Sequence, residues 1–341
     1  MQRASLLGAA ALVAATAAPA AAETITPARG NWDTGWFHTQ VYIEALEELG
    51  YDVEKPVTLA DAPRFQALAQ GDVDFSVMEW FPLFNETYSR VSGLTKVGYV
   101  VKAGALQGYL VDKATAEKLD VTNLNDFKRK AVREAFDADG DGKAEMVACP
   151  PGWDCGKVIQ HHIEAYGLSE HIDLIQASYS PAMGDAIASY KQGEPIFFYT
   201  WTPNWTLGVL EPGTDVTWLE VPHASLPADQ KQYEDATTVE GLDACASNPC
   251  RIGWPANDIR PVANAAWLAD HPDVKRLFEV MGVPLDAIYA QNAKMYEGAD
   301  SPKAIERHAE AWIDRNRETF DRWIAEAKAA RTEGVRVSPG P

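Results

Sequence analysis

Two short stretches of the chain share one pattern, VMEWFP at residues 77–82 and FYTWTP at residues 198–203. Each is an apolar run that predicts a strand, has a tryptophan at its end, and is stopped by a proline two positions later. One stretch lies in each half of the chain. Because ligands of open α/β sheets bind outside the carboxyl ends of the strands, each half is predicted to present one indole, Trp80 or Trp201, to a ligand crevice.

The segments around these stretches alternate between strand-like and helix-like patterns. A helix is expected from Asp33 or Thr34, either of which could cap it, to about Leu49, and the chain after Pro272 is expected to be helical to about Arg331. Alternation of this kind predicts an α/β layer structure with a largely parallel sheet. The other expected strands lie at 23–27, 55–59, 97–109, 172–177 and 216–221, and the other expected helices at 63–70, 157–166 and 181–192.

Two further tryptophans lie where an α/β fold places ligands. Trp32 follows the first expected strand, and Trp153 lies in the stiff segment CPPGWDC, residues 149–155. Each could be an ordinary core residue, but four indoles at loop edges favour a shared site. Aromatic faces suit a trimethylammonium group, which is cationic and cannot donate hydrogen bonds.

Charge and the N-terminus limit the class of protein. The formal net charge of −19 argues against a nucleic-acid partner and against an anionic membrane surface, and it suits a cationic or zwitterionic ligand. Residues 1–22 carry Arg3, an alanine- and leucine-rich run and three final alanines, which predict a secretory signal peptide and a mature start near Glu23. An exported protein can form disulfides.

The four cysteines form two close pairs in the sequence, Cys149 with Cys155 and Cys245 with Cys250. Three connectivities are possible, and the local pairing closes small loops most easily. The alternative is a zinc site, although the spacings differ from those of zinc ribbons and no histidine lies near either pair. A bridged CPPGWDC segment would hold the indole of Trp153 in place.

Several segments carry a family resemblance: ALEELGYDVEKP, GDVDFSVMEWFPL, ALQGYLVDK, FDADGDGKAE, CPPGWDC, YKQGEPIFFYTWTP and YAQNAKM. Together they resemble the periplasmic glycine betaine/proline betaine-binding proteins of ABC transporters, over nearly all of the mature chain. The resemblance implies a two-lobe periplasmic binding protein of the type II clamshell class, with the ligand cleft between the lobes. We expect lobe 1 to comprise residues 23–110 plus 260–341, and lobe 2 residues 111–259.

The resemblance also implies the partners and the activity. The protein is expected to be a monomer that needs no cofactor and delivers a methylated amine to an ABC permease and its ATPase at the inner membrane. An enzyme acting on a methylamine is the competing hypothesis. The sequence offers it no nucleophile elbow, no glycine-rich phosphate loop and no metal-binding histidine pair, and we interpret His161 and His162 as surface residues.

Carried over residue by residue, the family's tryptophan box falls on Trp80, Trp153 and Trp201, and its loop disulfide on Cys149–Cys155. The family has a histidine that helps to hold the ligand carboxylate where this chain has Phe84. It has glycine where this chain has Asp154, and an aliphatic residue where this chain has Trp32.

These departures bear on the choice of ligand. Asp154 or Glu79 is expected to repel a ligand carboxylate, and Phe84 cannot donate to one. We therefore expect trimethylamine N-oxide to bind more tightly than glycine betaine. Glycine betaine, proline betaine and choline are the alternatives.

The acidic segment at residues 137–145 matches the first half of a calcium loop. The candidate ligands are the side chains of Asp137, Asp139, Asp141 and Glu145, with the Lys143 carbonyl. Position twelve is Ala148, where such loops need a bidentate glutamate. The alternative is a polar turn, so structural calcium is a hypothesis that competes with a metal-free loop.

Overall fold

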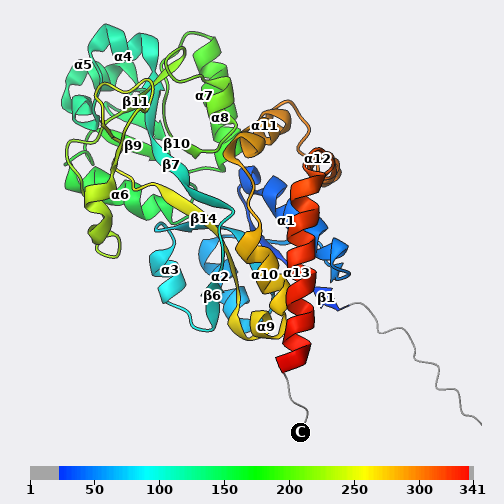
Figure 1. The fold of residues 1–341 in the computed structure, drawn as a ribbon. Coiled ribbons are helices and arrows are strands. Elements are labelled where there is room, and N and C mark those ends of the chain that lie inside the picture. The colour runs from blue at the N-terminus through cyan, green and yellow to red at the C-terminus, as the bar shows by residue number, and fades with distance from the viewer. Residues whose placement is uncertain (1–22, 338–341) are drawn as a thin grey trace, which may run out of the picture.

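The computed structural model describes residues 23–337, which form sheets flanked by helices (Figure 1). The expected signal peptide, residues 1–22, lies outside the described residues. The strands are β1 (Thr24–Ile25), β2 (Ala28–Gly30), β3 (Asp52–Val53), β4 (Val57–Leu59), β5 (Phe75–Phe81), β6 (Leu94–Lys96), β7 (Val101–Asp112), β8 (Ala144–Val147), β9 (Ile172–Ile175), β10 (Phe197–Thr202), β11 (Val216–Leu219), β12 (Thr238–Val239), β13 (Cys250–Arg251) and β14 (Asn257–Asn264).

Helices cover these strands and make up the end of the chain. The α-helices are α1 (Trp36–Glu48), α2 (Asp61–Gln70), α3 (Asn85–Ser89), α4 (Lys113–Leu119), α5 (Lys130–Ala135), α6 (Cys155–Ala165), α7 (Tyr179–Lys191), α8 (Thr206–Val209), α9 (Ala265–Asp270), α10 (Pro272–Val280), α11 (Leu285–Tyr296), α12 (Pro302–Arg315) and α13 (Arg317–Val337). The 3-10 helices are η1 (Asp33–Gly35), η2 (Leu124–Lys128) and η3 (Lys231–Ala236).

The largest sheet is mixed, with strand order β5-β14-β7-β10-β8-β9, while β11 pairs with β7 and β6 with β14. β14 runs antiparallel to β5, β6 and β7, and β7 runs antiparallel to β10 and β11. Parallel pairs in this sheet, within residues 23–337, are β10–β8 and β8–β9. The prediction of a largely parallel sheet is therefore wrong for the central strands, which pair antiparallel. The two longest strands come from remote parts of the chain, so the local strand–helix alternation does not determine how they pair.

β7 and β14 lie next to each other between two groups of elements (Figure 1). Helices α4 to α8 gather with β8, β9 and β10 on one side, and α1, α2, α10 and α13 gather with β5 on the other (Figure 1). Two long strands between two such groups suit a pair of lobes joined by a hinge. The division into residues 23–110 plus 260–341 and residues 111–259 stays a prediction.

The predicted helical tail is confirmed and covers the β5 side of the molecule. α13 packs against α10, and α12 packs against α1. The ring of Trp312 lies edge-on to that of Phe37, with 6.3 Å between centroids, and Trp312 and Trp323 are both buried. At the start of α12, Ser301 Oγ caps the helix by accepting the backbone N–H of Ala304.

The start of the first long helix differs from the prediction. Asp33 and Thr34 lie in η1, and α1 begins only at Trp36, with no side chain capping either helix. Thr34 Oγ1 instead accepts the indole N–H of Trp201 at 3.2 Å, and Asp33 Oδ2 accepts the hydroxyl of Ser180 at 3.1 Å. Both partners belong to the other group of elements. The side chains of Asp33 and Thr34 therefore bind the other group of elements and cap no helix.

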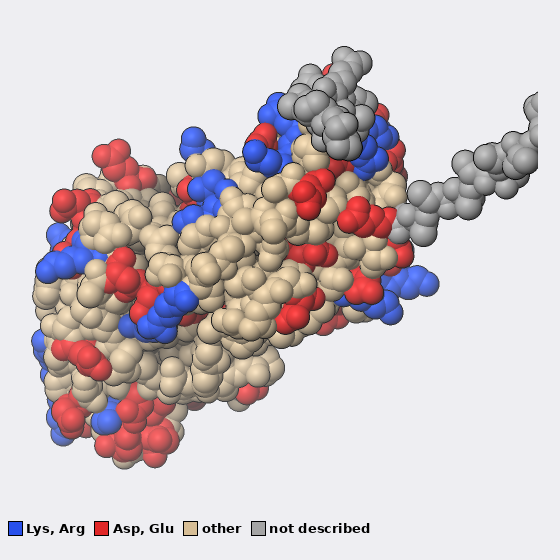
Figure 2. All heavy atoms as spheres, turned by 90° about the horizontal axis from the view of Figure 1, so that it is seen from below, with Lys and Arg blue, Asp and Glu red and all other residues tan. Residues whose placement is uncertain are grey.

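The surface carries charges of both signs. On the face shown in Figure 2, acidic and basic side chains are interspersed, and no continuous basic patch is seen there. Among the described helices, none combines the length and the apolarity that a membrane crossing needs.

Candidate ligand-binding site

A small cavity of about 30 Å³ lies among aromatic side chains from both groups of elements. Sites for drug-sized ligands measure roughly 300–1,000 Å³, so this cavity suits a compact ligand. All four predicted tryptophans line it. The lining residues are Trp32, Asp61, Trp80, Leu83, Phe84, Gln107, Trp153, Cys155, Tyr199 and Trp201.

The indoles enclose the cavity because their planes are steeply inclined to one another. Trp153 meets Trp201 at 5.7 Å and 70°, and meets Trp32 at 5.5 Å and 70°. Tyr179 packs against Trp201 at 4.5 Å, with the planes 45° apart. Rings arranged in this way can turn several negative π faces toward one compact cation.

Strand geometry explains how two of these rings reach the cavity. Trp80 is the last residue but one of β5, and Trp201 is the last but one of β10. Tyr199 and Trp201 are two residues apart, so they lie on the same face of β10. Trp201 is paired with Gln107 of β7, which brings that amide to the same face.

The CPPGWDC segment supplies the third ring. Cys149 and Cys155 are disulfide-bonded, with their Cα atoms 6.0 Å apart, as the resemblance implies. The indole N–H of Trp153 donates to Asn31 Oδ1 at 2.8 Å. The bridged loop thus holds Trp153 against the segment that follows β2.

Trp32 differs from the other indoles because a cation already lies on it. The guanidinium carbon of Arg64 is 4.7 Å from the centre of the Trp32 ring and 5.6 Å from that of Phe84. Arg64 is fully buried. A cation on one face weakens the attraction that the ring offers to a second cation, so Trp80, Trp153 and Trp201 are better placed to hold one.

Glu79 does not line the cavity, although the sequence analysis placed it near the ligand. It precedes Trp80 on β5, so its side chain points to the opposite face of the strand. There it accepts two hydrogen bonds from Arg64, at 2.7 and 2.9 Å, and one from Ser76 at 2.5 Å. Its charge is paired in this network, and the predicted repulsion of a ligand carboxylate by Glu79 has no basis in this geometry.

Asp154 is likewise absent from the cavity lining. Its carboxylate accepts the hydroxyl of Thr87 and lies 2.9 Å from Lys157 Nζ. Its backbone N–H donates to Asp61 Oδ2 at 2.7 Å. The predicted repulsion by the Asp154 side chain is therefore not supported, and the backbone amide of Asp154 is already engaged.

Asp61 and Gln107 line the cavity and were missed by the sequence analysis. Asp61 is fully buried at the start of α2, with Oδ1 3.3 Å from Arg64 Nη2. Burial raises the pKa of Asp61 to about 7, against the opposing effect of Arg64. Asp61 follows the expected strand 55–59 by two residues, so the strand-end pattern that marked the tryptophans could have found it. Gln107 lies within a long strand, where no local pattern marks a site.

Phe84 lines the cavity, as expected. Its ring lies 6.1 Å from that of Trp32 and 5.7 Å from that of Phe65. It closes this side of the cavity with an apolar surface that cannot donate a hydrogen bond.

The acidic loop brings its four carboxylates together. Oxygen atoms of Asp137, Asp139, Asp141 and Glu145 lie within 4.8 Å of one another. These carboxylates also accept backbone N–H groups of the loop, for example Gly142 N to Asp137 Oδ2 at 2.8 Å. Such bonds stabilise a polar turn without any ion, so calcium stays a prediction.

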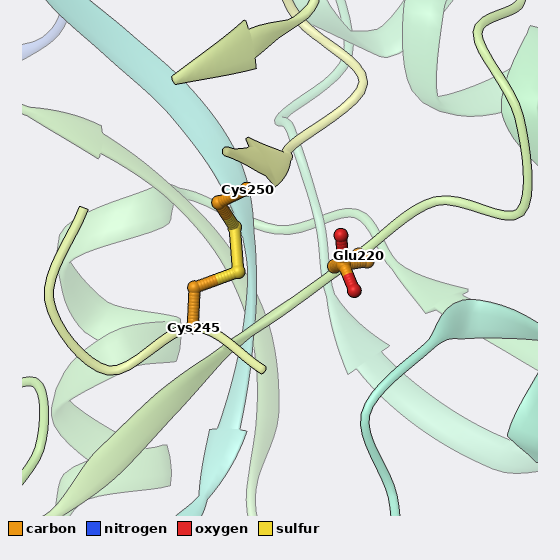
Figure 3. Close-up of side chains that lie close together, drawn as sticks. All are labelled: Glu220, Cys245 and Cys250. Carbon is orange, nitrogen blue, oxygen red and sulfur yellow. A yellow bond between two sulfur atoms is a disulfide. The ribbon is translucent and has the colours of Figure 1, made fainter. Parts of the chain in front are cut away.

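The second cysteine pair is also a disulfide. Cys245 and Cys250 are bonded and lie beside Glu220 (Figure 3), with their Cα atoms 5.9 Å apart. Zinc needs thiolates, and no described cysteine is free, so the zinc alternative is wrong. The predicted local pairing is confirmed for both pairs.

The interpretation of His161 and His162 as surface residues is wrong for His162. It is fully buried, with Nδ1 2.7 Å from the Tyr109 hydroxyl and Nε2 3.0 Å from the Ser225 carbonyl oxygen. Burial lowers the pKa of His162 to about 3, so it packs as a neutral core residue.

Comparison with known proteins identifies the family. Residues 23–315 match the family model OpuAC, described as the substrate binding domain of an ABC-type glycine betaine transport system. The chain belongs to this family. The predicted resemblance is therefore confirmed, and so is the expectation of a binding protein that is not an enzyme.

Individual relatives agree with this result. The chain is 40% identical, over 94% of both chains, to the glycine betaine-binding periplasmic protein OusX of Dickeya dadantii. It is 38% identical to the glycine betaine/proline betaine-binding periplasmic protein of Salmonella typhimurium, covering 90% of this chain and 91% of the relative. These relatives confirm the expected periplasmic location. The trimethylamine N-oxide-binding protein of Pelagibacter ubique is 24% identical, over 77% of this chain and 79% of its own.

A solved structure agrees with the fold. Lactococcal OpuAC, in a closed conformation complexed with glycine betaine, matches with a TM-score of 0.67 at 17% identity, covering 89% of this chain and 99% of its own. This likeness supports the α/β periplasmic binding protein fold.

Proposed function

We propose that this protein is the solute-binding component of an ABC importer and captures a compact solute with a trimethylammonium group. The observation that carries the proposal is the cavity lined by Trp80, Trp153 and Trp201, where the rings of Trp153 and Trp201 are inclined by 70° and suit a methylated cation. A permease and an ATPase at the inner membrane would accept the solute, and we expect the binding protein to act as a monomer.

Glycine betaine is the first ligand to test. The two relatives with 40% and 38% identity bind it by name, whereas the relative named for trimethylamine N-oxide is 24% identical. The comparisons therefore favour glycine betaine over the N-oxide, which the sequence analysis had ranked first. Proline betaine shares the quaternary nitrogen and the carboxylate, and is the next candidate.

Trimethylamine N-oxide stays a second candidate because of the polar end of the cavity. Phe84 has no donor, and the Asp154 amide donates to Asp61 instead of facing the ligand. Asp61 also adds a carboxyl group to the lining, where it would lie near a ligand carboxylate. Each feature leaves less support for a negatively charged ligand oxygen, and the N-oxide presents one such oxygen where a carboxylate presents two.

Calorimetric titration with glycine betaine, proline betaine, choline and trimethylamine N-oxide tests the proposal. If glycine betaine binds at least tenfold more tightly than the N-oxide, a gap of ~1.4 kcal/mol, the protein serves betaines. The opposite order would support the second candidate. Failure of all four ligands to bind would contradict the proposed function.

A further inference from the structure

One buried donor in the cavity lining has no partner. The side-chain nitrogen Nε2 of Gln107 makes no hydrogen bond, and the residue is 1% exposed. Among the described side-chain atoms that are buried without a partner, it is the one whose residue lines the tryptophan cavity. A buried amide N–H without an acceptor costs free energy, so such a group calls for an explanation.

The orientation of the Gln107 amide is fixed by its neighbour. The Tyr199 hydroxyl donates to Gln107 Oε1 at 2.6 Å. Burial raises the pKa of that hydroxyl well above its usual value of 10, so it keeps the proton that it donates. Because Oε1 is held by Tyr199, Nε2 is left as the free end of the amide.

Two indole donors and one backbone amide near the cavity are already used. The indole N–H of Trp153 donates to Asn31, and that of Trp201 donates to Thr34. The Asp154 amide donates to Asp61. None of these three groups is free to meet an oxygen atom on a ligand held between the rings, whereas Gln107 Nε2 is a buried donor without an acceptor.

We propose that Gln107 is a specificity-determining residue, whose Nε2–H donates to the oxygen at the polar end of the ligand. The acceptor is an oxygen that carries negative charge, on either a carboxylate or an N-oxide. The inference rests on the proposed function, since it takes the tryptophan cavity as the place of the methylated nitrogen. Gln107 takes the place of the donor that Phe84 cannot supply.

The test compares ligands with and without an oxygen atom. Tetramethylammonium offers the same methylated cation as glycine betaine and trimethylamine N-oxide but has no acceptor. Gln107→Met keeps the length of the unbranched side chain and removes the donor. Calorimetry should show the affinity of the variant for glycine betaine and for the N-oxide falling about tenfold, and its affinity for tetramethylammonium changing less than about twofold.

A second variant distinguishes the loss of the proposed hydrogen bond from a folding defect in Gln107→Met. Tyr199→Phe keeps Gln107 but frees its amide to rotate, and should weaken the oxygen-bearing ligands by about threefold while sparing tetramethylammonium. Gln160→Met, on the exposed face of α6, is the matched control and should bind all three ligands like the wild type.

The outcomes separate the two claims. If Gln107→Met loses affinity equally for all three ligands, or for none, the role of Gln107 is wrong while the tryptophan cavity stands. If the wild type binds none of the three, tetramethylammonium included, the proposed function itself fails.

Discussion

At the scale of single residues, neighbours on one strand have opposite roles. Trp80 faces the cavity, while Glu79 faces the other side of β5 and pairs with Arg64. The sequence could predict Trp80, because an aromatic residue at a strand end is a local pattern. It could not predict the pairing of Glu79, because Arg64 reaches it from another element.

The Asp61 carboxyl gives folding stability a pH dependence. Its pKa is about 7 in the folded state, against 3.8 as the ordinary value, because burial disfavours its charge more than Arg64 favours it. Glu79 and Asp154 are the other charged groups facing it. The folded protein thus holds this proton more tightly than the unfolded chain, and the stabilisation, complete below pH ~4, is lost as the pH rises through about 7.

Asp61→Asn isolates this effect, because the variant has no carboxyl to ionise. Urea unfolding at pH 5 and pH 8 should show the free energy of unfolding of the wild type falling, relative to the variant, by ~2 kcal/mol at the higher pH. The comparison cancels other titrating groups that the two proteins share. An equal difference between the two proteins at both pH values would contradict the raised pKa.

At the scale of elements, the bridged CPPGWDC loop is expected to serve binding, unlike the second disulfide. Removing either bridge by a Cys→Ser pair should cost about 2 kcal/mol of stability, from the loop-closure entropy. Only the pair at Cys149 and Cys155 holds Trp153, so only its removal should weaken glycine betaine binding, by about fivefold or more.

The double variant at Cys245 and Cys250 is the matched control, because its loop does not line the cavity. Urea unfolding measures the stability of both variants, and calorimetry measures their affinity. Equal losses of affinity in the two variants would refute a special role for the CPPGWDC loop.

The acidic loop at residues 137–145 gives a second prediction at this scale. If it binds calcium, millimolar calcium should raise the melting temperature by at least about 2 °C over the same protein in chelator. Asp141→Asn removes one of the clustered carboxylates and should abolish this rise. A wild type with no rise, and no calcium by elemental analysis, would leave the polar turn as the account of the loop.

Many elements could be predicted from local patterns, and their pairing could not. The strand ends at Trp80 and Trp201 and the helical tail follow from apolar periodicity and proline stops. The antiparallel pairing of β7 with β14 joins segments far apart in the sequence, and no local pattern encodes such a register. The prediction that Asp33 or Thr34 caps the helix is wrong for a related reason. Their side chains accept hydrogen bonds from Ser180 and Trp201, which are far away in the sequence.

At the scale of the whole molecule, several contacts link the two groups of elements across the cavity. Trp153 donates to Asn31, Trp201 donates to Thr34, and Lys157 Nζ lies 2.9 Å from Glu86 Oε2. If the two groups are lobes hinged at β7 and β14, these contacts form when the lobes close. Ligand binding should favour the closed form, because the cavity takes residues from both groups.

Small-angle scattering tests the predicted lobes. Saturating glycine betaine should reduce the radius of gyration by on the order of 1 Å, as the hinge closes. The same ligand concentration with Trp201→Ala is the control and should give a smaller change. A radius of gyration that ligand leaves unchanged would argue for a rigid molecule instead of a clamshell.

The central claim is that the tryptophan cavity recognises a methylated ammonium group. Calorimetry of the wild type and Trp201→Ala, with glycine betaine and with glycine, tests it most directly, since the two ligands differ only in the three methyl groups. The account predicts saturable one-to-one binding of glycine betaine, with binding at least ~30-fold weaker both for glycine and for the variant. Equal affinity of the wild type for the two ligands, or an unchanged affinity in Trp201→Ala, would contradict it.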